Sequence, residues 1–416
     1  MRNFYFTKSL VLFLALSVQS GAAEPADASC EPKSPIELLN CVLKHSPAIK
    51  EAKLDGSKAI AEESGARAWS NPEVDASTTV GDNFGVSEIT TEIGLKQTFS
   101  IGGARSSRID RAAASKEVAT ASLDEALATS VKDVVSGLHR LRQLAIEYDA
   151  FDEALNTFKR IQQQYKSRGR LGPEHSASLF VFDTAYKEAS LNRLHVLEEQ
   201  KKVRQSLNIA LGQDLNWGDQ HLPKKLSRWP DAPKKPDELL AADLRKVRAE
   251  SQISKAELGI ARGESWPEIG LGPIMERRAE GSDVFYSIGI GLSLPLPLWN
   301  WNGGARGMAR AEFEKAQIRV HTKEEEIRSE LERLSDAYQR TRTELQNFGD
   351  LSQMEKGHRN LEGLFARGLV SSGLVIETHR QILDFLEKLH ETESLALEQL
   401  LRLRAISGNS EAGDLL

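Results

Sequence analysis

The chain has 416 residues, of which 27% are charged and only 6% are aromatic. This composition suits long solvated helices better than one large globular core. The formal net charge of -6 supplies no basic field, so nucleic acid is not among the expected partners. The length could hold two or three ordinary domains, but an internal duplication indicates one fold of two similar halves.

The N-terminus has the parts of a secretory signal peptide. Arg2 and Lys8 form its positive end, Leu10 to Val18 its apolar core and Gly21 to Ala23 its small-residue cleavage site. A membrane-spanning helix needs about 20 apolar residues, so this shorter run disfavours the alternative of a transmembrane anchor. We predict that residues 1–23 are removed on export.

Cys30 and Cys41 are the only cysteines of the sequence. After export they meet an oxidising compartment, where disulfides persist. A short-loop disulfide that fixes the N-terminal segment is the simplest interpretation. Two unpaired thiols and a lipid anchor on Cys30 are the alternatives. Zinc sites need three or four ligands, so no metal site is expected from this pair.

The predicted elements recur in the same order in two halves of the chain. The first repeat covers residues 24–212 and the second covers 236–408. A linker rich in proline and glycine, 213–235, joins them, and a polar tail, 409–416, follows. Each repeat consists of a helix, two strands and a long helical hairpin. This self-similarity predicts a duplicated unit.

The first repeat contains an unusually long predicted helix. Its apolar residues recur in steps of three and four, which is typical of a coiled-coil seam. At 1.5 Å per residue the helix is about 90–95 Å long, which exceeds the width of a globular domain and fits a rod that reaches across a compartment. We predict, in order, a helix at 35–69, strands at 73–80 and 86–99, and helices at 104–166 and 174–211.

The second repeat has the clearest strand pattern. Apolar side chains occupy every second position from 284 to 298, with glycine, serine and two prolines among the residues between them. Period two gives a strand with one apolar face, and the prolines limit it to an edge or a terminal segment. We predict a helix ending at Trp266, strands at 269–275 and 284–298, one continuous helix at 305–366, and a return helix ending near Ala405.

The four predicted strands have an apolar face that no other sheet of the chain can bury. In lipid an open sheet edge leaves backbone groups unpaired, so the sheet must close into a barrel. The smallest membrane barrels have about 8 strands, so several copies must share one barrel and pack their helical hairpins into a tube. The alternative is a soluble sheet, with Glu88, Glu92 and Lys96 on a wet face, carried by a periplasmic coiled-coil scaffold.

Several short motifs occur in a specific order along the chain. Asn71-Pro72 precedes a strand, the strand pair ends in Gly102-Gly103-Ala104-Arg105, and Tyr165 and Gly169 lie at the hairpin turn. With their weaker second copy, these motifs resemble the TolC-type outer-membrane efflux family over essentially all of the mature chain.

The segment from Leu294 to Asn300, followed by Gly303-Gly304, is most similar to the cobalt–zinc–cadmium (heavy-metal) branch of that family. The resemblance implies an α+β membrane protein in the outer membrane that extends into the periplasm. It implies a homotrimer with a 12-stranded barrel in outer-membrane lipid and a 12-helix periplasmic tube. It also implies docking to a periplasmic adaptor and an inner-membrane proton-driven pump.

The two hairpin turns are the best candidates for partner docking, because in the family the tips contact the adaptor and move when the channel opens. The alternative is structural, since any helical hairpin benefits from glycine in a tight reversal. Carried over by position, the tip residues are Arg168, Gly169, Arg170, Leu171 and Gly172 in the first hairpin and Arg367, Gly368, Leu369, Val370 and Ser371 in the second.

Two further pairs of residues are candidates for channel function. Glu174 and Glu377 lie shortly after the tips and could form an acidic ring in a narrow lumen, although the helix dipole also favours glutamate at a helix start. Trp299 and Trp301 follow the last strand and suit a membrane–water interface. Core packing at the strand–helix junction is the alternative for these tryptophans.

No catalytic motif is present, so we expect neither an enzyme nor a cofactor. The nine histidines show no paired spacing typical of a metal site, so the chain itself is not expected to bind metal. We predict a passive exit duct of a tripartite efflux system, and the resemblance implies heavy-metal cations as its cargo. A duct for organic compounds or secreted polypeptide and a non-pore periplasmic scaffold are the alternatives.

Overall fold

A computed structural model describes most of the chain, and residues Glu31–Leu416 form one compact unit. The predicted signal peptide, residues 1–23, lies outside the described residues. Both cysteines, Cys30 and Cys41, are disulfide-bonded. The segments that are not described are 1–29, 84–85, 168–171, 234–237, 348–351 and 410.

The helix predicted at 35–69 is two helices, α1 (Pro35–His45) and α2 (Pro47–Arg67). The break is at Ser46, whose backbone is extended with ψ 129°. A proline disfavours helical backbone in the residue before it, and Pro47 occupies the first position of α2, where its missing N–H costs nothing. The prediction of one helix was wrong because it overlooked this proline.

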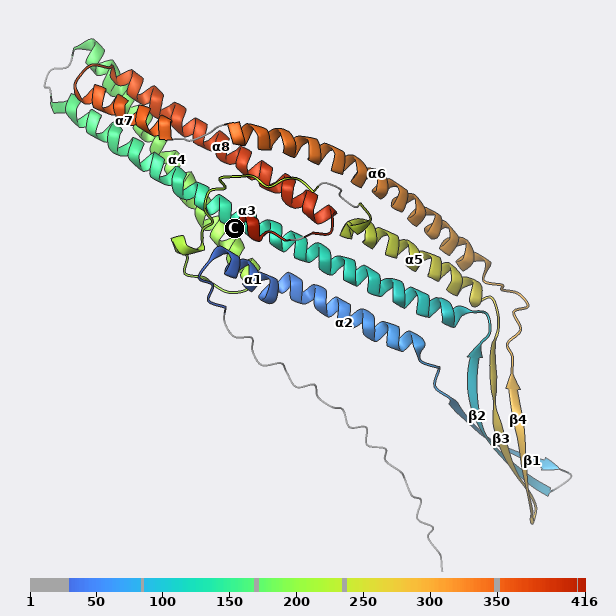
Figure 1. Cartoon of the computed structure of the whole chain (residues 1–416). Coiled ribbons are helices and arrows are strands. Elements are labelled where there is room, and N and C mark those ends of the chain that lie inside the picture. Colours follow the sequence, from blue (N-terminus) through green and yellow to red (C-terminus); the bar gives the residue numbers. More distant parts are fainter. Residues whose placement is uncertain (1–29, 84–85, 168–171, 234–237, 348–351, 410) are drawn as a thin grey trace, which may run out of the picture. The chain divides into compact units, whose positions relative to one another are not determined.

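A four-stranded antiparallel sheet joins the two repeats. Its strand order is β1-β2-β3-β4, so the pairing of β2 with β3 unites the halves in one sheet (Figure 1). The strand predicted to reach residue 298 ends at Ser293, before Pro295 and Pro297, which cannot donate to a ladder. The strands are β1 (Glu73–Asn83), β2 (Val86–Ser100), β3 (Glu268–Glu280) and β4 (Asp283–Ser293).

The helices form a bundle around α3, which contacts α2, α4, α5 and α8. Figure 1 shows the sheet at one end of this bundle and α7 toward the other. The described parts of the helix predicted at 305–366 are α6 and α7, and residues 348–351 between them lie outside the described residues. The remaining helices are α3 (Ala104–Ser167), α4 (Pro173–Leu211), α5 (Ala242–Gly263), α6 (Gly303–Asn347), α7 (Ser352–Ala366) and α8 (Ser372–Ile406), with short 3-10 turns at Asp219–His221, Glu238–Leu240 and Gly413–Leu415.

The core of the bundle follows the apolar stripe of α3. Val131, Val134, Leu138 and Leu141 are each at most 3% exposed, in agreement with the predicted seam. Burying each such side chain stabilises the folded state by about 1.5–3 kcal/mol. None of the described helices has an apolar stretch long enough to span a membrane.

The duplication is visible at the start of each long helix. Gly103 (φ 82°) directly precedes α3, and Asn302 (φ 55°) directly precedes α6. Left-handed backbone is open to glycine and tolerated by asparagine. The same bend from strand to helix is therefore made by different residues in the two repeats.

Candidate functional site

The two faces of the sheet differ in chemistry, with Arg277 as an exception on the mainly apolar face. Directly paired residues lie on the same face and successive residues on opposite faces. The register places Ala76, Ile93, Met275 and Ile288 in one row across all four strands. Ile93 is 52%, Met275 49% and Ile288 84% exposed. Other apolar members of this face are Val74, Val80, Ile89, Leu95, Phe99, Leu271, Val284, Tyr286, Ile290 and Leu292.

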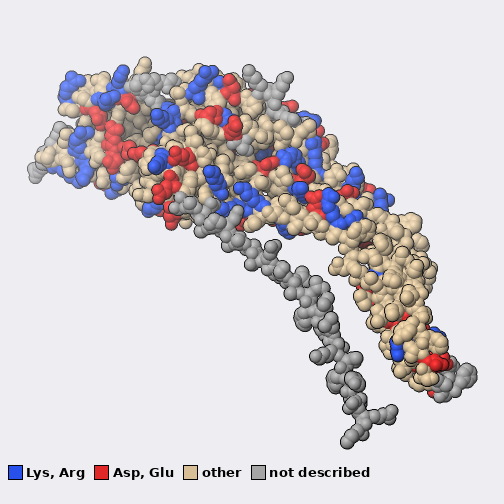
Figure 2. Space-filling view, turned by 60° about the horizontal axis from the view of Figure 1, so that its bottom comes forward, with Lys and Arg blue, Asp and Glu red and all other residues tan. Residues whose placement is uncertain are grey.

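The opposite face of the sheet is polar. The neighbouring row consists of Ser77, Glu92, Glu276 and Ser287. Ion pairs cross this face. Lys96 Nζ lies 2.7 Å from Glu73, and nearer the hairpin ends Arg278 Nε lies 3.1 Å from Glu88. In Figure 2 the sheet has few charged side chains along its middle, whereas charges are dense over the helices. An exposed apolar face of this extent indicates a partner surface or lipid.

Four tryptophans mark the junction between the sheet and the helices. Trp299 and Trp301 follow β4 and are 92% and 61% exposed, so the structure does not place them in a core. Trp69 precedes β1 and Trp266 precedes β3, and both are more than half exposed. In the sequence, Trp69 and Trp266 stand out only as counterparts in the two repeats. Each of the two lies shortly before the proline that precedes its strand pair. This shared position was the sequence signal that could have grouped them with Trp299 and Trp301 at the junction.

The two hairpin tips differ in how much of them is described. In the first tip, Arg168, Gly169, Arg170 and Leu171 lie outside the described residues. Gly172 is exposed and has an ordinary φ of -68°, so it does not use the conformational freedom of glycine.

The second tip is a well-formed helix end. Gly368 has φ 74°, and the Leu369 N–H donates to Leu364 O at 3.0 Å, as in a Schellman-type cap. The side chain of Ser371 caps α8 by accepting from Leu374 N. Leu369 is 65% exposed, and Arg367 and Val370 lie beside it in the turn. The second tip therefore exposes an apolar side chain, Leu369, close to a basic one, Arg367.

The two hairpins are joined near their tips. The Tyr165 hydroxyl donates to Ser372 Oγ at 3.1 Å. Behind this contact lies an apolar cluster from α3, α4 and α8, in which Phe158, Phe182 and Val375 are at most 4% exposed. The described parts of the tips therefore rest on one shared core.

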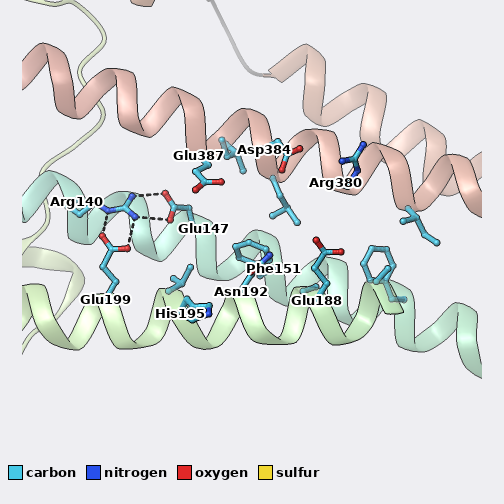
Figure 3. A pocket seen from close by; sticks show the side chains of 17 residues that line it. Arg140, Glu147, Phe151, Glu188, Asn192, His195, Glu199, Arg380, Asp384 and Glu387 are labelled. Carbon is cyan, nitrogen blue, oxygen red and sulfur yellow. Dashed lines mark hydrogen bonds and ion pairs between the residues drawn. The ribbon is translucent and has the colours of Figure 1, made fainter. Parts of the chain in front are cut away.

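A carboxylate-rich pocket lies between α3, α4 and α8 on the sheet side of that cluster (Figure 3). Arg140 bridges two of its acids, with Nη1 2.8 Å from Glu147 and Nε 2.7 Å from Glu199. Glu147 also lies 2.6 Å from His390 Nδ1. The other acids of the pocket, which have no dashed contact in Figure 3, are Glu188, Asp384 and Glu387.

Glu147 is the buried member of this network. Burial would raise its pKa, but hydrogen bonds from His390 and Arg140 outweigh that effect and hold the pKa below the ordinary value of 4.5. The lowered pKa means that the folded state binds the Glu147 proton more weakly than the unfolded state does. The resulting stability is present above pH 4.5 and is lost as the pH falls through the folded pKa.

Glu147→Gln is expected to lower the free energy of unfolding by about 2–3 kcal/mol at neutral pH, because charged hydrogen bonds are lost in a buried place. The difference from wild type should shrink below pH 4.5. Denaturant unfolding followed by circular dichroism measures both. Glu188→Gln, an exposed acid of the same pocket, should change stability by less than about 0.5 kcal/mol; equal effects of the two variants would contradict a structural role for the network.

The two acidic candidates near the tips are placed differently. Glu174 lies in the first turn of α4, and its side chain is outside the described residues. Glu377 on α8 is partly exposed, and hydrogen bonds from Arg380 and Gln381 lower its pKa. Arg380 Nη2 is 2.9 Å from Glu377 Oε1, so the carboxylate is ionised but locally paired.

The structure brings together one group of residues that the spacing of the histidines in the sequence does not predict. His358 and Glu362 on α7 meet His379 on α8, and their ligand atoms all lie within 4.8 Å of one another. The spacing of four residues on α7 places His358 and Glu362 on one helix face. His379 lies 17 residues after Glu362 in the sequence, so only the fold brings it beside the other two side chains.

Comparisons with known proteins agree with this architecture. Residues 38–213 match the family described as outer membrane efflux protein. The fold is similar to those of CusC (TM-score 0.66, 14% identity, 94% of this chain and 96% of that chain) and VceC of Vibrio cholerae (0.69, 16%, 90% and 96%). It is also similar to the CmeC outer membrane channel of Campylobacter jejuni (0.71, 15%, 99% and 96%). No curated protein sequence matches the chain.

Proposed function

We propose that this chain is a channel of the outer membrane efflux protein family, located in the outer membrane and extending into the periplasm. The family match covers the first repeat, and the shared fold extends over both repeats. The observation that carries the proposal is the four-stranded sheet with one apolar face. A row such as Ala76, Ile93, Met275 and Ile288 suits lipid, and the polar row beside it suits a water-filled lumen.

The sheet also indicates how the channel assembles. β1 and β4 are the outer strands of the sheet, and in lipid their free edges must be paired. Closure needs about 8 strands or more, so one chain with four cannot close alone. A homotrimer joins β4 of one copy to β1 of the next and yields 12 strands. The helical bundles of the three copies then continue the lumen as a tube.

For the cargo we propose heavy-metal cations, delivered by an inner-membrane pump through a periplasmic adaptor. The support is the similarity of Leu294 to Asn300 and Gly303-Gly304 to the heavy-metal branch. The adaptor would dock on the tips, where Arg367 and Leu369 are exposed, and Trp299 and Trp301 would lie at the membrane–water interface. The duct is passive and is not an enzyme. A duct for organic compounds or secreted polypeptide is the second candidate.

Single-channel conductance in a planar bilayer tests the pore. We expect discrete, cation-selective current steps from the purified trimer. Glu377→Gln should reduce cation selectivity, because it removes a carboxylate near the tip and the ion-pair partner of Arg380 on the same helix. Glu391→Gln is the matched control, since Glu391 pairs with Lys388 on the same helix at 2.8 Å but lies farther from the tip. Absence of current from a monomer that sediments in water would instead support the periplasmic scaffold.

A further inference from the structure

We propose that His358, Glu362 and His379 bind one divalent transition-metal ion between α7 and α8. Nε2 of His358 lies 3.1 Å from Nε2 of His379. Oε1 of Glu362 lies 3.9 Å from the same His379 nitrogen. This binding site is independent of the channel function proposed above, because it rests on these three side chains alone.

The separations suit a tetrahedral ion. Zinc lies about 2.0–2.1 Å from histidine nitrogen, so two such ligands at a tetrahedral angle are about 3.3–3.4 Å apart. The two nitrogens need to separate by about 0.2–0.3 Å, and the carboxylate oxygen needs to approach His379 Nε2 by about half an ångström. A change of side-chain torsion in Glu362, which is partly exposed, is sufficient for that approach.

The hydrogen bonds around the three residues orient their lone pairs. His379 Nδ1 donates to the backbone oxygen of Val375 at 2.9 Å, because a carbonyl oxygen can only accept. In the neutral imidazole the Nε2 atom of His379 then carries the lone pair, and it faces His358. Thr157 on α3 donates to Glu362 Oε1 at 3.0 Å. Outer hydrogen bonds of this kind, from a histidine to a carbonyl and to a ligating carboxylate, are typical of metal sites.

The local charge also favours a cation. The Glu153 carboxylate on α3 lies 3.9 Å from His358 Nδ1, and Glu362 supplies a second negative charge. The opposing group is Arg160, 3.7 Å from Glu362, but its side chain is 61% exposed and water screens it. Phe158 packs edge-on against His379 at 5.4 Å and keeps water from that side.

The donor set decides the class of ion. Two imidazole nitrogens and one carboxylate oxygen suit zinc, cobalt, nickel or copper rather than magnesium or calcium, which prefer oxygen ligands alone. Three protein ligands leave a fourth position for water. A bound ion would connect α7 to α8 and, through Thr157, to α3, and so tie both hairpins together below their tips.

A simple hydrogen bond between the two histidines also gives a short nitrogen–nitrogen distance, and binding experiments separate the two cases. The trimer is purified, stripped with a chelator, and titrated with Co²⁺ in the presence of a weak competing chelator. We expect one Co²⁺ per chain with the intense visible bands of tetrahedral cobalt, which zinc then displaces. Weak octahedral bands, or no binding in competition with the chelator, would overturn the proposal.

Variants locate the ion. His358→Gln, His379→Gln and Glu362→Gln are each expected to weaken cobalt binding by on the order of 100-fold or more and to abolish the tetrahedral bands. Glu362→Gln keeps an oxygen that can accept from Thr157, so the fold is least disturbed by this change. It is the decisive variant if a histidine variant fails to form trimers. His195→Gln is the control, since His195 is exposed on α4, and it should bind like wild type. Unchanged binding in all three variants would place the ion elsewhere.

Discussion

Ile288→Lys is expected to prevent assembly of the barrel. Ile288 lies in the middle of β4 and pairs with Met275 on the apolar face. A lysine on the lipid face of a barrel costs about 2–4 kcal/mol near the bilayer centre, and a homotrimer carries three copies of the change. The measurement is the yield of heat-modifiable trimer in the outer-membrane fraction, which should fall severely.

Ser287→Lys is the matched control for this effect. Ser287 is the preceding residue, on the polar face, where it pairs with Glu276. A lysine there faces a carboxylate and water, so trimer yield should remain close to that of wild type. If both variants assembled equally well, the apolar face would not contact lipid, and the hypothesis that the sheet is part of a membrane barrel would be wrong.

Gly263→Ala is expected to destabilise the junction between the sheet and the helices. Gly263 ends α5, and a Cβ there would lie 2.7 Å from Cα of Ala104. Since that neighbour is backbone at the start of α3, it cannot swing aside as a side chain would. We expect a loss of about 1–3 kcal/mol in the free energy of unfolding, typical of overpacking.

Gly65→Ala makes the same change in another helix, where a Cβ would meet nothing within 4 Å. It should stabilise the protein by roughly 0.5–1 kcal/mol, because alanine is the better helix former. Denaturant unfolding of both variants compares the two effects. Stabilisation by Gly263→Ala would show that α5 and α3 do not need this close approach.

The local periods of the sequence were enough to predict the elements and the faces of the strands. Alternation from Val284 onward predicted β4 because side chains in a strand point to opposite faces in turn, and steps of three and four predicted the buried stripe of α3. Breaks were harder, since they depend on single residues. Pro47 divides the first helix, because the residue before a proline avoids helical backbone.

The tertiary structure decided which distant residues meet. The pairing of β2 with β3, which unites the repeats, and the bridge from Arg140 to Glu147 and Glu199 depend on how helices and strands pack. The same holds for His379, which reaches His358 and Glu362 only because α8 returns beside α7. Sequence periodicity reports the environment of each residue within its own element, so it determined the amphipathic strands and the long helices. Contacts between elements arise from packing, and only the folded chain shows them.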